Sequence, residues 1–328
     1  MSASNPAVAR PAPAMHPMKR VAAYGQEFIL LGAILVLFIV VGLVNPRFFG
    51  ANNITNIFAG NAYIAVAAIG MSLVIISGHI DVAVGSLIGV LATVSGTLAV
   101  NGYPIWIAWL VPVLIGIAVN AGVGALIAYL RIPSIVVTLG MLSILKGGLI
   151  SVTGGAWISN LPQDYLIAQF RLFGIPSPVW FMVILTALVA FWMRYSGFGR
   201  TIYAIGGNVE AARVAGIQVE RSTVIVFAIH GAFAGIAAVL FATQLQVIQS
   251  TVPPNLELTV ITASVVGGVS ILGGTGTVIG STLAAILFAA IASSLIFLNV
   301  SAYWLRAVQG LLILITVLAD MARRRRLR

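Results

Sequence analysis

The chain has 328 residues, of which 60% are hydrophobic and only 7% are charged, and its mean hydropathy is +1.11. A soluble core cannot hide so large an apolar fraction, so this composition excludes an ordinary water-soluble domain. The net charge of +10 would suit nucleic acid in a soluble protein, but here the basic residues lie between and beyond the apolar runs, which disfavours a nucleic-acid partner.

The first stretch, residues 1–25, is rich in Pro and Ala and contains Lys19 and Arg20 just before the first apolar run. It predicts a disordered N-terminal tail on the cytoplasmic side, because it offers little apolar surface to bury. A cleaved signal peptide is disfavoured, since the apolar run from Phe28 to Val44 is longer than a typical signal core and no clear small-residue cleavage site follows.

Apolar runs of about twenty residues then alternate with short polar breaks. Backbone groups in lipid must form their hydrogen bonds within the protein, so these runs are expected to be helices. We therefore expect an all-α, polytopic integral membrane bundle over 26–321, followed by a basic cytoplasmic tail at 322–328. The ten expected spans are 26–44, 60–77, 82–100, 105–130, 132–152, 177–195, 223–247, 257–272, 277–298 and 302–321.

The distribution of basic residues predicts the orientation of the chain. With ten spans and the N-terminus inside, most of the 17 Lys and Arg residues lie on the cytoplasmic side. Only Arg47, Arg171 and Arg306 then lie outside, and Lys146 falls within a span. Since positive charge is retained inside, both termini are expected in the cytoplasm, in a multi-pass protein of the cell inner membrane.

Few ionisable side chains fall within the expected spans, and those few are candidates for a transport pathway. A charge at mid-bilayer costs about 2.5–3.5 kcal/mol on insertion scales and is retained mainly for function. The candidate pathway residues are His79 and Asp81, although Asp81 is also suited to cap the span that begins at Val82. With Lys146 and His230 they form a thin set for a proton relay, and an ion-coupled secondary transporter of a small polar solute stays open as the alternative function.

Two expected outer segments differ from simple turns. The loop 153–176 carries Trp157, and the connection VIQSTVPPNLE ends at Glu257. Each is either a plain linker or a docking surface for a molecule that arrives from outside. Between them, the pattern Gly231-x-x-x-Gly235 predicts close packing of one helix against another.

Charged residues gather in the largest internal cytoplasmic loop, in the sequence GGNVEAARVAGIQVERS. Gly206 and Gly207 are expected to break the chain, and Asn208 is a suitable N-cap for a short helix. Glu210 lies in its first turn, where the helix dipole favours an anion, and Gly216 is a suitable stop. A helix of about two turns is too short to be stable alone, so it must pack on something.

The same loop, expected over 196–222, offers a contact surface. Ala211 and Ala212 are small and allow close backbone approach, whereas Glu210 and Arg213 are able to pair with charges on a partner. The loop is either a solvated connection whose arginines only fix the topology or a docking surface for another protein.

The pattern Glu210-Ala211-Ala212-x-x-x-Gly216 resembles the EAA-xxx-G loop of ABC-importer permeases, whose short helix sits in a cleft of the ATPase subunit. The resemblance extends from about residue 30 to residue 320. In the same order along the chain, four segments resemble the bacterial ribose-type sugar permease family: GHIDVAVGS (78–86), RIPSIVVTLGMLSILKG (131–147), GRTIYAIGGNVEAARVAGI (199–217) and VITASVVGGVSILGGTGTVIGS (260–281).

This resemblance implies one pore half of an ABC importer that moves a monosaccharide across the inner membrane. The implied partners are a separate ABC ATPase subunit, a periplasmic sugar-binding protein, a second permease subunit in a homodimer or heterodimer, and membrane lipid. That family usually carries Gly where this chain has His79, and TGGAWISNLP at 153–162 is similar to the rhamnose or autoinducer-2 branch. The resemblance places ATPase coupling on Gly206, Gly207, Asn208, Glu210, Ala211, Ala212, Arg213 and Gly216.

The sequence predicts no catalytic, cofactor or metal site. No G-x-x-x-x-G-K-[ST] phosphate loop occurs, so an ATPase is expected to be a separate polypeptide. The chain has no cysteine, and its three histidines, among them His16, lack metal-ligand spacing. Ser86 and His230 occur without a G-x-S-G motif, which disfavours an intramembrane protease. We therefore expect a transport subunit and not an enzyme.

Overall fold

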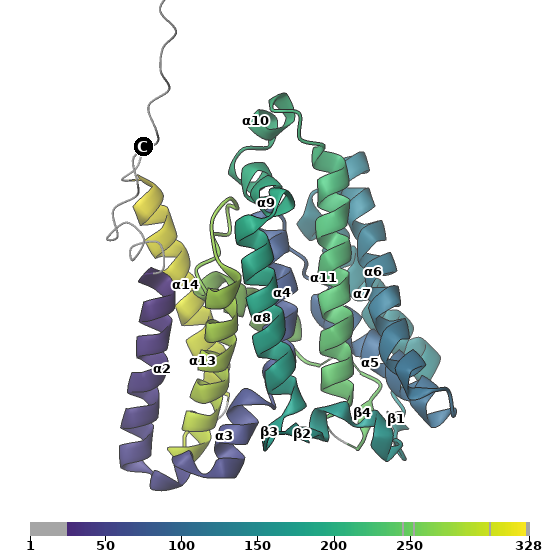
Figure 1. Ribbon diagram of the computed structural model, residues 1–328, viewed down its shortest axis with the longest axis vertical. Coiled ribbons are helices and arrows are strands. Elements are labelled where there is room, and N and C mark those ends of the chain that lie inside the picture. Colours follow the sequence, from purple (N-terminus) through teal and green to yellow (C-terminus); the bar gives the residue numbers. More distant parts are fainter. Residues whose placement is uncertain (1–24, 245, 252, 302, 326–328) are drawn as a thin grey trace, which may run out of the picture.

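The computed structural model of the chain describes residues 25–244, 246–251, 253–301 and 303–325. The long helices run roughly in one direction and form a bundle, as expected for an all-α membrane protein (Figure 1). The predicted tail at 1–25 lies outside the described residues except for Gly25. The helices are α2 (Gly25–Val44), α3 (Ala51–Phe58), α4 (Ala62–Ile76), α5 (Val84–Val100), α6 (Ile105–Leu130), α7 (Ser134–Thr153), α8 (Ser177–Tyr195), α9 (Gly197–Gly207), α10 (Val209–Val214), α11 (Val219–Ala242), α12 (Leu256–Val266), α13 (Val278–Phe297) and α14 (Trp304–Arg325).

Each of the ten expected spans contains a helix. Among the described residues, eight stretches are long and apolar enough to cross a membrane: Gly25–Val44, Ala51–Ile76, Ile105–Leu130, Ser134–Thr153, Ser177–Tyr195, Val219–Ala242, Val278–Phe297 and Trp304–Ala322. The other two, α5 and α12, are apolar but have only 17 and 11 residues. These findings confirm a polytopic helical membrane bundle.

Some boundaries differ from the predicted ones. Helix α12 ends at Val266, although the apolar pattern continues to 272, because the chain turns at Gly268 with a φ of 95°. Helix α11 begins four residues earlier than predicted, at Val219, since hydropathy alone does not distinguish a polar first turn from a loop. Helix α14 continues to Arg325, into the segment expected to be a basic tail.

Helix α4 forms the centre of the bundle, and all of its residues except Tyr63 are buried. Two contacts join it to neighbours that are distant in sequence. The Ser72 hydroxyl donates to Ser281 Oγ of α13 at 2.7 Å, and the Ser264 hydroxyl of α12 donates to the carbonyl oxygen of Ala68 at 3.3 Å. Helices α12 and α13 therefore pack directly on α4, and so does α11, where a Cβ atom on Gly70 would lie 3.2 Å from Cα of His230.

Helices α6 and α11 are in close backbone contact. A Cβ atom on Gly231 would overlap the carbonyl oxygen of Gly116, and one on Gly235 would lie 2.5 Å from Cα of Val113. Only glycine permits this approach, so the Gly231-x-x-x-Gly235 pattern indeed marks a helix-packing surface. The two helices are held together over much of their length.

Short elements cluster at one end of the bundle, opposite to the end that carries α10 (Figure 1). There β1 (Trp157–Ile158) pairs antiparallel with β4 (Ile248–Gln249), and β2 (Arg171–Leu172) pairs with β3 (Ile175–Pro176). The β1–β4 pair joins the two segments that were expected to lie on the outer side. The short 3-10 helices are η1 (Pro46–Phe49), η2 (Gln163–Tyr165) and η3 (Ile167–Gln169).

Candidate functional site

Helix α10 projects beyond the ends of the long helices and forms the tip of the bundle (Figure 1). The Asn208 side chain caps it by accepting a hydrogen bond from the Ala211 N–H at 2.9 Å. Gly216 stops it with a φ of 82°, and the Ile217 N–H donates to the carbonyl oxygen of Ala212 at 3.0 Å. The predicted start and stop of this helix are thus confirmed.

A second helix, α9, precedes α10 and was not predicted. The Ser196 side chain caps it by accepting from the Gly199 N–H at 2.8 Å. Its glycine content lowers its intrinsic helix propensity, and it forms because Ile202 and Ile205 are buried against the rest of the protein. Gly206 and Gly207, expected to break the chain, are its last two residues.

Ala212 is the buried anchor of α10. It is 4% exposed and packs in a small apolar cluster with Ile205 of α9 and Val219 of α11. This contact supplies the packing that so short a helix requires. Most of the other residues of α10 stay exposed, and Val214 is 89% exposed.

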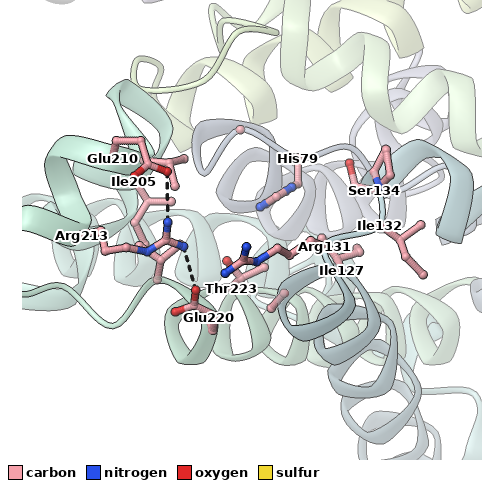
Figure 2. Close-up of a pocket in the computed structure, with 15 residues that line it drawn as sticks. His79, Ile127, Arg131, Ile132, Ser134, Ile205, Glu210, Arg213, Glu220 and Thr223 are labelled. Atoms are coloured by element: carbon pink, nitrogen blue, oxygen red, sulfur yellow. Dashed lines mark hydrogen bonds and ion pairs between the residues drawn. The ribbon is translucent and has the colours of Figure 1, made fainter.

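Arg213 ties α10 to the first turn of α11. Its guanidinium pairs with Glu210 at 3.0 Å and with Glu220 at 2.7 Å, as Figure 2 shows. The pKa of Glu220 is lowered, first by a backbone hydrogen bond and then by the hydrogen bond from Arg213. The hydrogen bond from Arg213 to Glu220, with the attraction of Glu210, raises the pKa of Arg213. We call Glu210, Arg213 and Glu220 the charge clip.

The charge clip should loosen in acid. A carboxyl with a lowered pKa stabilises the folded arrangement at neutral pH, and that contribution is lost as the pH falls through the lowered value, below the ordinary 4.5 of Glu220. We expect Glu220→Gln to give faster amide hydrogen exchange in α10 than the wild type at pH 7. After correction for the intrinsic exchange rate at each pH, the wild type should exchange as fast as this variant only below pH 4.5. Equal protection in both proteins at pH 7 would contradict a structural role for the clip.

A cavity of about 500 Å³ separates α10 from the turn between α6 and α7. Arg131 ends α6 with a φ of 55°, and its side chain extends toward Thr223 and Glu220 (Figure 2). His79 lines the opposite side, and the N–H of the following residue, Ile80, donates to Ser134 Oγ at 3.2 Å. The candidate pathway residue His79 therefore lines the same cavity as the candidate coupling helix.

Asp81 lies apart from that cavity and is completely buried. One carboxylate oxygen accepts the Ala83 N–H at 2.7 Å, just ahead of α5. The other lies 3.2 Å from Nε2 of His230 and accepts from the Asn120 side chain at 3.4 Å. Since His230 is also 0% exposed, these side chains form a closed polar cluster between α5, α6 and α11.

Sequence reasoning treated Asp81 and His230 separately and did not predict that they meet. Their contact depends on Gly70 of α4, because a Cβ atom there would lie 2.7 Å from Nδ1 of His230. In the sequence, nothing distinguishes a glycine that makes room for a buried side chain from any other glycine within an apolar run. The intramembrane charges themselves were the only signal that could have suggested the pair.

The chain is similar in sequence to membrane permeases of transport systems. A family model described as branched-chain amino acid transport system / permease component matches residues 53–317. The autoinducer 2 import system permease protein LsrC of Escherichia coli O9:H4 (strain HS) is 33% identical over 296 residues, which are 90% of this chain and 86% of that protein. The proteins of the same description from Shigella flexneri and Salmonella typhi are 34% and 35% identical, again over 90% of this chain and over 86% and 85% of their own lengths. No solved structure matches the chain significantly.

Proposed function

This chain belongs to the family of branched-chain amino acid transport system permease components, and on that premise we propose that a separate ATPase drives solute import by engaging α10. As a member of this family, the protein is the membrane-spanning permease subunit of an ABC importer and not an enzyme. The proposal concerns how the residues of this chain couple to the ATPase, how the chain is oriented in the membrane and which solute it transports.

The observation that carries the proposal is the exposed apolar surface of α10. Val214 is 89% exposed and Val209 is 41% exposed, on the helix that forms the tip of the bundle (Figure 1). Ala211 and Ala215 are exposed beside them, so that small side chains leave the helix backbone approachable. A partner that covers this surface removes apolar area from water, which stabilises the contact by roughly 25 cal/mol per Å².

Two features make α10 suitable for transmitting movement. Ala212 is buried against α9 and α11, and the charge clip joins α10 to the start of α11. Force applied to α10 therefore reaches a membrane-spanning helix directly. In this proposal, Gly206 and Gly207 form a hinge between α9 and α10, and Asn208 and Gly216 set the ends of α10. Ala211 and the residues of the charge clip contact the ATPase.

The proposal places the α10 end in the cytoplasm. Arg194, Arg200, Arg213 and Arg221 lie near this end, and a cytoplasmic location agrees with the preference of basic residues for that side. Both termini then lie in the cytoplasm, and the β1–β4 end faces the compartment from which a solute-binding protein delivers its cargo. A second permease subunit completes the pore.

The proposed cargo is a small hydroxylated solute, either a monosaccharide or the autoinducer 2 that appears in the names of the relatives. Such a solute needs a path with mildly polar contacts. The Asp81 and His230 side chains are 0% exposed, which argues against a proton relay from water through this pair.

Reconstitution distinguishes the ATP-driven importer from an ion-coupled carrier. We expect proteoliposomes that contain the permease, its ATPase and the binding protein to accumulate labelled ribose, rhamnose or autoinducer 2 only with ATP on the α10 side. A protonophore should leave this uptake unchanged. Uptake that needs no ATP and stops with the protonophore would establish the ion-coupled carrier instead.

A further inference from the structure

The described residues between β4 and α12, 250–251 and 253–255, enter the bundle deeply and form no helix or strand. At the β1–β4 end, the Ile248 side chain packs on Gly96 of α5. By Glu257 the chain has reached Gly85, where an added Cβ atom would lie 2.8 Å from the Glu257 backbone nitrogen. Gly96 and Gly85 are eleven residues apart on α5, so the segment descends by about 16 Å along that helix.

The described residues of this descending segment, 250–251 and 253–255, are not fully covered by the rest of the chain. Pro254 and Leu258 are exposed, and Leu258 is 53% exposed, while Asn255 and Glu257 are partly exposed. Non-helical backbone at membrane depth is tolerated only where it is buried in protein or lines a water-filled cavity. An uncovered descent with polar side chains therefore indicates a water-accessible path.

Glu257 is the decisive residue because it carries a carboxylate at this depth. Among the described residues, none gives its side chain a hydrogen bond or a salt bridge. Its Oε2 occupies the space above Gly85, 2.5 Å from where a Cβ atom would stand, so Gly85 leaves room for the carboxylate. A charge in this position cannot face lipid cheaply and is retained for function.

A plainer explanation is that Glu257 only stabilises the first turn of α12 through the helix dipole. That explanation accounts for an acidic residue near the start of the helix. It does not account for the depth of the site, the exposed side of the segment, or the space that Gly85 leaves beside the carboxylate.

We propose that residues 253–258 line the solute path and that the Glu257 carboxylate binds hydroxyl groups of the passing solute. This inference rests on the proposed function, since it requires a hydroxylated cargo and a pore. The chemistry is suitable, because an ionised carboxylate only accepts hydrogen bonds and each hydroxyl of a sugar donates one. The site needs no charge on the solute.

The absence of cysteine from the chain allows a direct test of accessibility. In the assembled importer, a thiol introduced by Glu257→Cys should react with a water-soluble methanethiosulfonate reagent. Saturating ribose, rhamnose or autoinducer 2, whichever the wild type transports, should slow this reaction at least fivefold. Two matched variants set the background: Leu256→Cys, at a side chain that is 4% exposed, and Leu188→Cys, on the outer surface of α8 at 58% exposure.

Three results would overturn the inference. Glu257→Cys could remain as unreactive as Leu188→Cys, its reaction could be unaffected by the transported solute, or it could react only with a lipid-soluble maleimide. The dipole explanation predicts the second of these. Wild-type uptake in the same vesicles is measured separately, so loss of ATP-driven uptake there would reject the proposed function, whereas normal uptake with an unprotected thiol would reject only the Glu257 site.

The KM for uptake in a second variant tests the same site without an introduced thiol. Glu257→Gln keeps the size of the side chain but weakens its acceptance of hydroxyl hydrogen bonds, so we expect the KM for uptake to rise about tenfold. Glu257→Asp, which keeps the carboxylate, should recover part of the affinity. An unchanged KM in Glu257→Gln would also overturn the proposal.

Discussion

Gly216→Val should abolish ATP-driven uptake while leaving the protein inserted in the membrane. Gly216 has a φ of 82°, and a β-branched residue in this left-handed conformation costs about 1–2 kcal/mol or more. Helix α10 has only six residues, so a penalty of this size is enough to unfold its last turn. Uptake and co-purification of the ATPase should therefore fall together, each by at least tenfold.

The control for this variant is Gly148→Val in α7. Nothing lies within 4 Å of a Cβ atom at Gly148, and its backbone does not have a positive φ, so the same added side chain should leave uptake near the wild-type level. Glu210→Lys provides a second test, because it reverses a charge whose side chain is 79% exposed and leaves in place the Arg213–Glu220 pair, which joins α10 to α11. Normal uptake in both Gly216→Val and Glu210→Lys would exclude α10 as the coupling element.

Asp81→Ala should produce the largest loss of stability among single substitutions in the membrane core. It removes the acceptor of the Asn120 side chain and the carboxylate that lies 3.2 Å from His230 Nε2, and each polar group left unsatisfied at a buried site typically costs about 1–3 kcal/mol. We expect a fall in Tm of several degrees in detergent and a lower yield of inserted protein. The double variant Asp81→Ala/His230→Leu should recover part of the loss, because it no longer strands a buried imidazole.

Asp81→Asn separates a structural role from a role in transport. The amide oxygen is still able to accept the Ala83 N–H, so a mainly structural aspartate should tolerate this change with a small fall in Tm. Uptake should then remain within about threefold of the wild type. A large loss of uptake with an unchanged Tm would instead place Asp81 in the transport pathway, as one of the two hypotheses from the sequence requires.

The sequence predicted the membrane bundle well because hydropathy is additive along each span. Ten apolar segments correspond to helices, and the family resemblance that rested on four ordered segments is confirmed by the match over residues 53–317. The ends of α10 were also predictable, since Asn208 and Gly216 act through local backbone hydrogen bonds. Local chemistry determines such features, and local chemistry is visible in the sequence.

Features that depend on tertiary contact were not predictable in the same way. Helix α9 has a glycine-rich sequence and is stabilised by burial of Ile202 and Ile205, so propensity gave no indication of it. The pairing of β1 with β4 joins segments about ninety residues apart. The end of α12 at Val266 reflects the turn at Gly268, although the apolar character of the chain continues beyond it.

The contact of Gly116 with Gly231 has a mechanical consequence. Gly231 lies near the middle of α11, whose 24 residues extend for about 36 Å, and at this point α6 and α11 touch backbone to backbone. If α11 tilts by about 10° around that fulcrum, its two ends move in opposite directions by about 3 Å each. One end is joined to α10 by Arg213, and the other leads toward β4 and the descent to Glu257. A push on α10 is thereby inverted at the other end of α11, which is the geometry that a two-gated pore needs to keep one gate shut while the other opens.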